Sequence, residues 1–260
     1  MQWQGEGIII GSRKQGENNL VLEVMTLERG RCMGLVRGGR SRRQQPSLQP
    51  GNHVSLAWRG RLDEHLGAFT IEPLQQRAAA LMQAAHSLHA LQTLCALLRL
   101  LPERDPHPRL FHALDVILDH LDDPHIGALL LVRFELELLG ELGFGLDLTN
   151  CAATGATEDL IWVSPRSGRA VCRTAGAPYA AKLLELPAFL RSNDESNSFL
   201  ATQAMLPQPI EEIVKGFELT GYFLHKYIYE PRTLNWPPAR DSYLNALRRS
   251  QHSASENVTD

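Results

Sequence analysis

Short runs in which hydrophobic and polar residues alternate fill the first ~75 residues of the chain. This period of two is typical of half-buried strands, and turn-forming Gly, Asn and Pro residues separate the runs. The predicted strands are residues 7–10, 20–26, 32–36, 54–58 and 66–71. Five short strands without a long helix predict a small closed or partly closed barrel, such as an OB-fold.

The pattern changes near Leu74 to the three- and four-residue spacing of amphipathic helices. The first predicted helix runs from Leu74 to Leu101 and ends at Pro102. Further helices are expected over residues 109–121, 125–142, 178–190 and 209–229. Asp123 and Pro124 are suitable as cap and first residue of helix 125–142. This helix is apolar on nearly all sides, which predicts that it lies at the centre of the helical core.

Residues 151–176 are rich in Thr and Gly and contain two short apolar runs, 160–163 and 170–172, which predict a β-hairpin. The predicted fold class is therefore α+β, with an N-terminal five-stranded OB-fold-like barrel followed by an α-helical domain that carries the inserted hairpin. The expected domains are an OB-fold at 1–75, a helical domain in two parts at 76–150 and 177–250, the hairpin at 151–176 and a disordered tail at 251–260.

Composition narrows the class of protein. The 260 residues are 43% hydrophobic and 21% charged, which is typical of a folded globular chain. No apolar run approaches the roughly 20 residues needed to cross a bilayer, and no basic leader precedes one. Four cysteines without a CxxC motif do not predict a disulfide scaffold. We therefore expect a soluble cytoplasmic protein with reduced thiols.

Charge is unevenly distributed along the chain. Residues 1–61 carry ten Arg and Lys against four Glu, a net +6, whereas residues 81–150 carry a net −6. Four of these arginines, Arg37, Arg40, Arg42 and Arg43, lie within seven residues of a Gly-rich loop between two predicted strands. Guanidinium groups suit phosphate oxygens, and this loop contains no carboxylate. The loop is therefore predicted to bind an anionic partner, and its two glycines to keep it open until that partner orders it.

Other residues of the barrel extend this prediction. Lys14 and Arg59 are expected to enlarge the basic surface, and Arg29, Arg31 and Arg61 are further candidates. Trp3 and Trp58 are candidates for stacking on unpaired bases, whereas Phe69 is interpreted as a core residue. The alternative basic group is Lys182, Lys215 and Lys226 in the C-terminal helices.

The residues give little support for a metal centre or a catalytic site. Cys151 and Cys172 each begin a pattern similar to a zinc knuckle, but Thr154 and Ala175 occupy the positions of the second cysteines. Structural zinc needs four ligands, so no intact zinc site is expected. The Asp119-His120 segment is the alternative, as the metal site of a hydrolase. No nucleophile or nucleotide-binding motif is present, and no catalytic residue is predicted.

In its order of motifs the chain resembles the RecO family of recombination-repair proteins. The matching segments are Trp3 with Glu6-Gly7-Ile8-Ile9, Gly16-Glu17, Thr26 to Arg31, Gly34 to Arg40, Leu48 to Gly51, and Arg133 to Leu139 with Leu142-Gly143. Each segment alone is weak, but their order and spacing cover most of the chain.

The resemblance implies a non-enzymatic protein without a cofactor, whose hairpin is similar to a zinc finger. Such proteins bind single- and double-stranded DNA and anneal complementary strands in DNA repair. They contact the acidic C-terminal tail of single-stranded-DNA-binding protein (SSB), and with RecR they help RecA load onto coated DNA. They act in the cytoplasm at the nucleoid. With only Cys151 and Cys172 as remnants, this sequence departs from the four-cysteine pattern of some relatives, which argues against the metal and not against the fold.

Arg133 is the candidate residue for the SSB tail, because a lone cation on an apolar helix is costly unless it meets an anion or the surface. The alternative is a simple ion pair with Glu137, four residues further on. Two other functions stay open beside DNA binding: the Asp119/His120 hydrolase, and a protein-only adaptor whose arginine loop binds an acidic protein.

Overall fold

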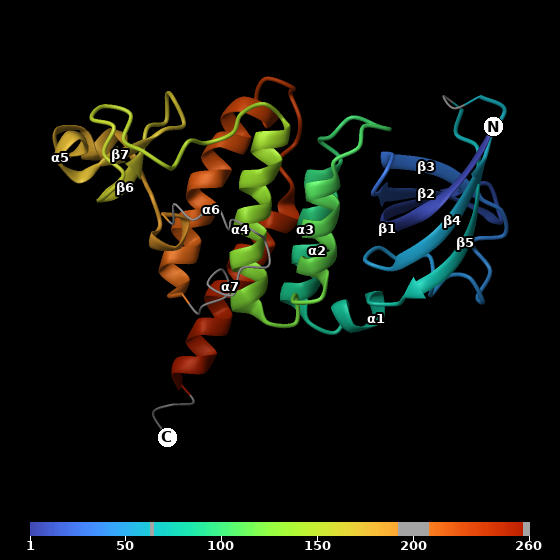
Figure 1. The fold of residues 1–260 in the computed structure, drawn as a ribbon. Coiled ribbons are helices and arrows are strands. Elements are labelled where there is room, and N and C mark those ends of the chain that lie inside the picture. Colours follow the sequence, from blue (N-terminus) through green and yellow to red (C-terminus); the bar gives the residue numbers. More distant parts are fainter. Residues whose placement is uncertain (63–64, 192–207, 257–260) are drawn as a thin grey trace. The chain divides into compact units, whose positions relative to one another are not determined.

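A computed structural model describes residues 1–62, 65–191 and 208–256, and the chain divides into two compact units, Met1–Asp122 and Asp123–Asp260 (Figure 1). The first unit contains the barrel and helices α1 to α3, and the second contains further helices and a small three-stranded sheet. The predicted α+β class is confirmed. Within the described ranges, no helix is both long and apolar enough to cross a membrane.

Five strands form the barrel: β1 (Gln2–Gln15), β2 (Asn19–Thr26), β3 (Gly30–Val36), β4 (His53–Arg59) and β5 (Ala68–Gln75). They are hydrogen-bonded in the order β1-β2-β3-β5-β4, and β4 pairs with β1 to close the ring. The β3–β5 pair is parallel and joins Leu35 to Ala68, whereas the other pairs are antiparallel. This closed five-stranded architecture agrees with the predicted OB-fold.

Strand β1 is much longer than the predicted strand 7–10, because it pairs with two neighbours in succession. Gln2–Ile8 pair with β4, and Gly7–Gln15 pair with β2. A Cβ atom on Gly7 would lie 2.4 Å from Val24 Cγ1, so only glycine fits where the strand passes from one neighbour to the other. The ends of β1 are polar and carry no strand pattern, and the two ladders hold them in strand conformation.

Alternate strand positions fill the barrel interior. The buried cluster consists of Ile9, Leu22, Val24, Cys32, Val36, Leu48, Val54, Leu56, Trp58 and Phe69. Phe69 is a core residue as expected, but Trp58 is also buried, at 3% exposure, and is not free to stack on a base. Trp3 is half-buried at the edge of the cluster. Its indole stacks on that of Trp58, with ring centres 6.1 Å apart.

The prediction of one helix over residues 74–101 is wrong for the residues before Ala85. Strand β5 continues to Gln75 because its last residues still pair with β4, and α1 (Ala78–Leu81) is only one turn long. Helix α2 (Ala85–Leu98) begins after a break, and α3 (Pro108–Leu118) agrees with the predicted second helix. Sheet pairing has overridden helix propensity in this segment.

Buried polar groups hold the start of the helical segment to the barrel. The Asn52 carbonyl Oδ1 accepts a hydrogen bond from the Ala78 backbone N–H at 3.0 Å. Arg77, also buried, donates to Asp115 at 2.8 Å and to Asp119 at 2.7 Å. Because these contacts lie within the first unit, the barrel and the helices that follow it form one body.

The second unit is built on four helical elements: α4 (Pro124–Glu141), α6 (Ile210–Leu224), the π-helical turn η4 (His225–Tyr229) and α7 (Pro238–Glu256). The predicted cap is confirmed, because Asp123 Oδ1 accepts from the backbone N–H groups of His125 and Ile126. Helix α4 is buried on most of its surface and packs beside α6, as expected of a central helix (Figure 1). Helix α7 continues into the segment 251–260 as far as Glu256.

One ion pair is fully buried among these helices. Arg240 Nε lies 2.7 Å from Glu135 Oε1, and Arg240 Nη2 lies 2.9 Å from Glu135 Oε2. Thr220 donates its hydroxyl to the same carboxylate, and Arg240 also donates to the Phe217 carbonyl at 2.6 Å. Burial opposes the charge on Arg240, but the Glu135 carboxylate outweighs it and raises the pKa of Arg240. The pair therefore joins α4, α6 and α7 through satisfied polar groups.

The predicted hairpin is confirmed at both strands, β6 (Leu160–Val163) and β7 (Ala170–Cys172). The helix predicted at 178–190 is wrong. After the short helix α5 (Arg173–Gly176), this segment forms two 3-10 turns, η1 (Ala177–Lys182) and η2 (Ala188–Leu190), separated by strand β8 (Leu184–Glu185). Strand β8 pairs with β6, so the hairpin recruits residues that local sequence favours as helix.

Replacing Arg240 with Met leaves the Glu135 carboxylate buried without its counter-charge. We expect the free energy of unfolding to fall by about 3–5 kcal/mol, measured by urea titration followed by circular dichroism. Arg173→Met is the matched control, because Arg173 pairs with Asp159 where both side chains are exposed. That control is expected to lose less than about 1 kcal/mol. Equal losses in the two variants would contradict a structural role for the buried pair.

Candidate nucleic-acid interface

The arginine loop follows directly from the end of β3 and is a hydrogen-bonded turn. Ser41 N–H donates to the Gly38 carbonyl at 2.9 Å, and Gln44 N–H donates to the Ser41 carbonyl at 3.0 Å. Gly38 adopts φ +65°, a conformation that favours glycine. Gly38 therefore allows a defined turn at the start of the loop.

Arg40 fastens this loop to the turn between β1 and β2. Its guanidinium donates to the carbonyl oxygens of Gly16, at 3.2 Å, and of Glu17. Its backbone N–H donates to the Asn18 carbonyl at 3.1 Å, and Asn19 Oδ1 accepts from Gly38 N–H at the same distance. Arg40 is half-buried, so it is partly a structural residue, whereas Arg37, Arg42 and Arg43 are exposed.

Strand register brings the other two predicted cations to the base of the loop. Lys14 lies two strands away from Val36, the residue before Arg37. Arg59 lies two strands away from Leu35 on the opposite side. Each separation is about 10 Å across the sheet. We call the six residues Lys14, Arg37, Arg40, Arg42, Arg43 and Arg59 the basic surface.

The charge of the basic surface is not neutralised internally. Among the residues that the structure describes, no carboxylate lies within salt-bridge distance of any of its six side chains. Arg31, in contrast, lies 2.7 Å from Glu23 and 3.7 Å from Glu103, so it does not extend this surface. An exposed group of uncompensated cations attracts polyanions through their phosphates.

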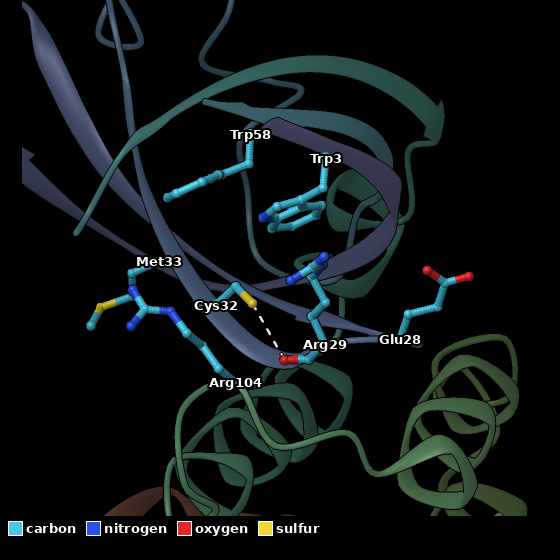
Figure 2. Close-up of a pocket in the computed structure, with 7 residues that line it drawn as sticks. All are labelled: Trp3, Glu28, Arg29, Cys32, Met33, Trp58 and Arg104. Carbon is cyan, nitrogen blue, oxygen red and sulfur yellow. Dashed lines mark hydrogen bonds between the residues drawn. The ribbon is translucent and has the colours of Figure 1, made fainter. Parts of the chain in front are cut away.

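A pocket of about 290 Å³ opens at the mouth of the barrel, beside the turn between β2 and β3 (Figure 2). Its lining residues are Trp3, Glu28, Arg29, Cys32, Met33, Trp58 and Arg104. Arg104 comes from the connection between α2 and α3, and sequence analysis did not associate it with the barrel. No local pattern could have done so, because Arg104 reaches the pocket through a tertiary contact of its backbone N–H with the Arg31 carbonyl, at 2.9 Å.

The hairpin brings its two cysteines together without making a metal site. Both thiols are buried, and the Cys172 backbone N–H donates to Cys151 Sγ at 3.3 Å. The hydroxyls of Thr154 and Thr174 lie 3.6 Å and 3.3 Å from Cys172 Sγ. Burial opposes ionisation, but hydrogen bonds from the Thr154 hydroxyl and nearby N–H groups lower the pKa of Cys151 to about 6.

These contacts do not fit structural zinc, which takes four ligating side chains. Hydroxyl and backbone groups surround the sulfurs where two further thiolates would be needed. Across the described residues, no group of three or more His, Cys, Asp or Glu is arranged to hold a metal ion.

The Asp/His segment is used in structural contacts. Asp119 Oδ1 accepts from Arg77 and from Gln75, at 2.7 Å and 3.2 Å. The His120 ring nitrogen Nδ1 lies 2.9 Å from the Val116 carbonyl, one turn earlier. Asp123 caps α4. Asp119 and His120 thus both make contacts with neighbouring residues of the first unit.

Arg133 lies half-buried on α4. Its Nη2 donates to the Phe189 carbonyl at 3.3 Å, and burial lowers its pKa. A desolvated guanidinium with a neutral carbonyl as its hydrogen-bond acceptor retains capacity for an anion.

Comparison with known proteins gives consistent matches over nearly the whole chain. The family profile described as "Recombination protein O N terminal" matches residues 1–77, and "Recombination protein O C terminal" matches residues 82–234. The chain is 54% identical to "DNA repair protein RecO" of Agrobacterium fabrum over 256 residues, covering 98% of this chain and 97% of the relative. It is 52% identical to the protein of the same name from Sinorhizobium medicae, over 98% of both chains.

Purified protein is expected to contain well under one zinc ion per chain, because Cys151 and Cys172 are its only cysteines in the hairpin. Elemental analysis measures the metal, and a chelator should leave the melting temperature unchanged. A variant with Thr154→Cys and Ala175→Cys restores four cysteines and serves as the zinc-binding control. Stoichiometric zinc in the unaltered protein would overturn the expectation.

Proposed function

The chain belongs to the RecO family of DNA repair proteins, and from this membership we propose that it binds single- and double-stranded DNA through the basic surface and anneals complementary strands. It acts without catalysing bond chemistry and without a cofactor. With RecR it helps RecA load onto SSB-coated DNA, in the cytoplasm at the nucleoid.

The single observation that carries DNA binding is the uncompensated charge around the end of β3. Contacts of guanidinium groups with phosphates position a strand without reading its sequence, so binding is expected to be nearly independent of sequence. Annealing needs two polyanions held together against their mutual repulsion, which a group of exposed cations can screen.

In the alternative basic group of Lys182, Lys215 and Lys226, two of the three lysines already have close partners. Lys215 lies 2.7 Å from Glu185 and 3.0 Å from Glu212. Lys226 donates to the Pro165 carbonyl and lies over the rings of Tyr222 and Tyr227. These contacts favour the basic surface of the barrel over the C-terminal helices as the primary DNA site.

The other two functions have weaker support. A hydrolase needs Asp119 free for a metal, whereas this carboxylate is engaged by Arg77 and Gln75. A protein-only adaptor would use the arginine loop for an acidic protein, and it predicts negligible affinity for DNA even at low salt.

For SSB, we propose that Arg133 receives the acidic tail. An apolar tail end suits Leu136, a half-buried residue one turn further along α4, and the carboxylates of the tail suit the Arg133 guanidinium, whose pKa burial lowers. The alternative of a local ion pair with Glu137 would leave the tail affinity unaffected by Arg133.

Replacing Arg37, Arg42 and Arg43 with Ala removes three exposed cations and keeps Arg40, which holds the loop. The slope of log K against log salt for single-stranded DNA should become shallower by about 2 units, at about 0.7 per phosphate contact. Fluorescence anisotropy of a labelled strand at several salt concentrations measures this slope, and strand annealing should fall in parallel.

The control for this experiment replaces Arg166, Arg173 and Arg248, three exposed arginines of the second unit, and removes the same charge. It should leave the slope unchanged. An unaltered slope in the loop variant, or an equal loss in the control, would contradict the basic surface as the DNA site.

Changing Arg133 to Glu should weaken binding of an SSB-tail peptide at least tenfold, because a carboxylate replaces the proposed anion-binding group, while DNA affinity stays within about twofold. Isothermal titration with the peptide measures the first effect and anisotropy the second. Arg133→Gln is the second variant: it removes the positive charge without introducing a negative one, and it is less disruptive to the fold. Tail affinity that is unchanged in both folded variants would count against this site.

A further inference from the structure

We infer that the pocket at the barrel mouth holds one nucleobase of a bound single strand, with Trp3 as the stacking surface and Arg29 and Arg104 as partners of the adjoining phosphate. This inference rests on the proposed DNA binding, and it adds a base contact to a surface that otherwise contacts only phosphates.

Trp3 is a rigid aromatic platform. One face of its indole stacks on Trp58, with the two planes 15° apart, and its edge meets Phe69 at a ring separation of 6.2 Å. Trp58 is itself held by its indole N–H, which donates to the Leu66 carbonyl at 3.1 Å. Because Trp3 is fixed from behind and only half-buried, a planar group can stack on it at little cost in side-chain entropy.

A planar cation already lies on Trp3. The guanidinium carbon of Arg29 is 5.0 Å from the centre of the Trp3 ring, and Figure 2 shows this guanidinium next to the indole. Arg29 is exposed and, among the described residues, has no carboxylate within salt-bridge distance. It can therefore turn from the ring to a phosphate when a base takes its place, since both contacts suit a guanidinium.

Arg104 supplies a second cation from a constrained backbone. It is a non-glycine residue at φ +60°, a conformation that L-residues rarely adopt and that is enriched at ligand sites. Its N–H donates to the Arg31 carbonyl, and its Nη2 donates to the His65 carbonyl at 3.1 Å. These two hydrogen bonds to backbone carbonyls hold Arg104 at the pocket. Its backbone is strained and its side chain is exposed.

The remaining walls suit a neutral heteroaromatic ring. Cys32 donates its thiol to the Arg29 carbonyl at 3.4 Å, and burial raises its pKa, so the sulfur is uncharged. The Met33 thioether is a soft, polarizable neighbour for a ring. The Glu28 carboxylate can accept a hydrogen bond from an N–H group of a base, such as thymine N3–H. A volume of about 290 Å³ lies at the lower end of small-molecule sites, which suits one base and not a longer ligand.

The pocket lies beside the first half of β3, and the arginine loop follows the end of this strand. Arg29 immediately precedes this strand and Arg37 immediately follows it, so they are about 26 Å apart along it. Arg59 extends the path on another side, because its β1 partner Gln2 is the neighbour of Trp3. A strand that lies along β3 therefore meets phosphate contacts at one end and a base contact at the other.

The test compares two oligonucleotides of about eight nucleotides, a length suited to one OB-fold. One is oligothymidylate, and the other has the same sugar–phosphate backbone but no bases. Anisotropy at one salt concentration gives the affinity ratio for the full-length protein, for Trp3→Ala, for Arg29→Ala and for Tyr179→Ala. Tyr179 is an exposed aromatic residue of the second unit and serves as the control. Melting temperatures identify any variant that fails to fold.

We expect the unaltered protein to prefer oligothymidylate by about fivefold or more, since stacking of one base contributes roughly 1–3 kcal/mol. Trp3→Ala should abolish the preference with little change in affinity for the base-free strand, Arg29→Ala should weaken binding of both strands, and Tyr179→Ala should change nothing. If Trp3→Ala does not fold, Trp3→Leu replaces it.

Equal affinity for the two strands in the unaltered protein would overturn the base site and leave DNA binding by the basic surface intact. A preference that survives loss of the Trp3 ring would also overturn it. Failure of both strands to bind would contradict the proposed function, and the base site with it.

Discussion

Closure of the barrel by β1 is the constraint on which the rest of the first unit depends. This one strand pairs with β4 over its first half and with β2 over its second, so the sheet has no free edge. The same register sets Trp3 against Trp58 near one end of β1 and carries Lys14 towards the arginine loop at the other. A change that shifted β1 by one residue would turn its core side chains outward and separate these groups.

The proposed phosphate contacts and the proposed base contact fall on different residues of the barrel unit: the basic surface and the pocket. The basic surface consists of exposed cations without carboxylate partners among the described residues, and such groups bind any strand. The pocket combines a fixed indole with two guanidinium groups, which favours an unpaired base over a paired one because a paired base cannot leave its stack freely. In the proposed annealing, the basic surface attracts the two polyanions, and the pocket holds a base of one strand until the complementary strand arrives.

The second unit is organised by a different interaction, the buried pair of Glu135 and Arg240. Neither residue differs in type from the exposed charges around it in the sequence, and only the packing of α4 against α6 and α7 desolvates them. In the hairpin, the hydroxyl groups of Thr154 and Thr174 lie beside the buried Cys172 sulfur, which thus has polar contacts without a metal ion. In both cases, buried polar groups have polar partners within the fold.

Local pattern was sufficient for much of this protein. Alternation predicted the barrel strands, short apolar runs predicted the hairpin strands β6 and β7, and the Asp123-Pro124 signal predicted the start of α4. Each of these signals depends on residues within a few positions of one another. The arginine loop was equally visible as a charge cluster. The ends of β1, the strand at Glu72–Gln75 and the β8 segment were not, since pairing with distant strands overrides their local preference. Only the tertiary structure decided that Trp58 is buried, that Trp3 is half-buried and that Arg104 lines the same pocket as Trp3. Burial and contacts between distant residues have no local signature in the sequence.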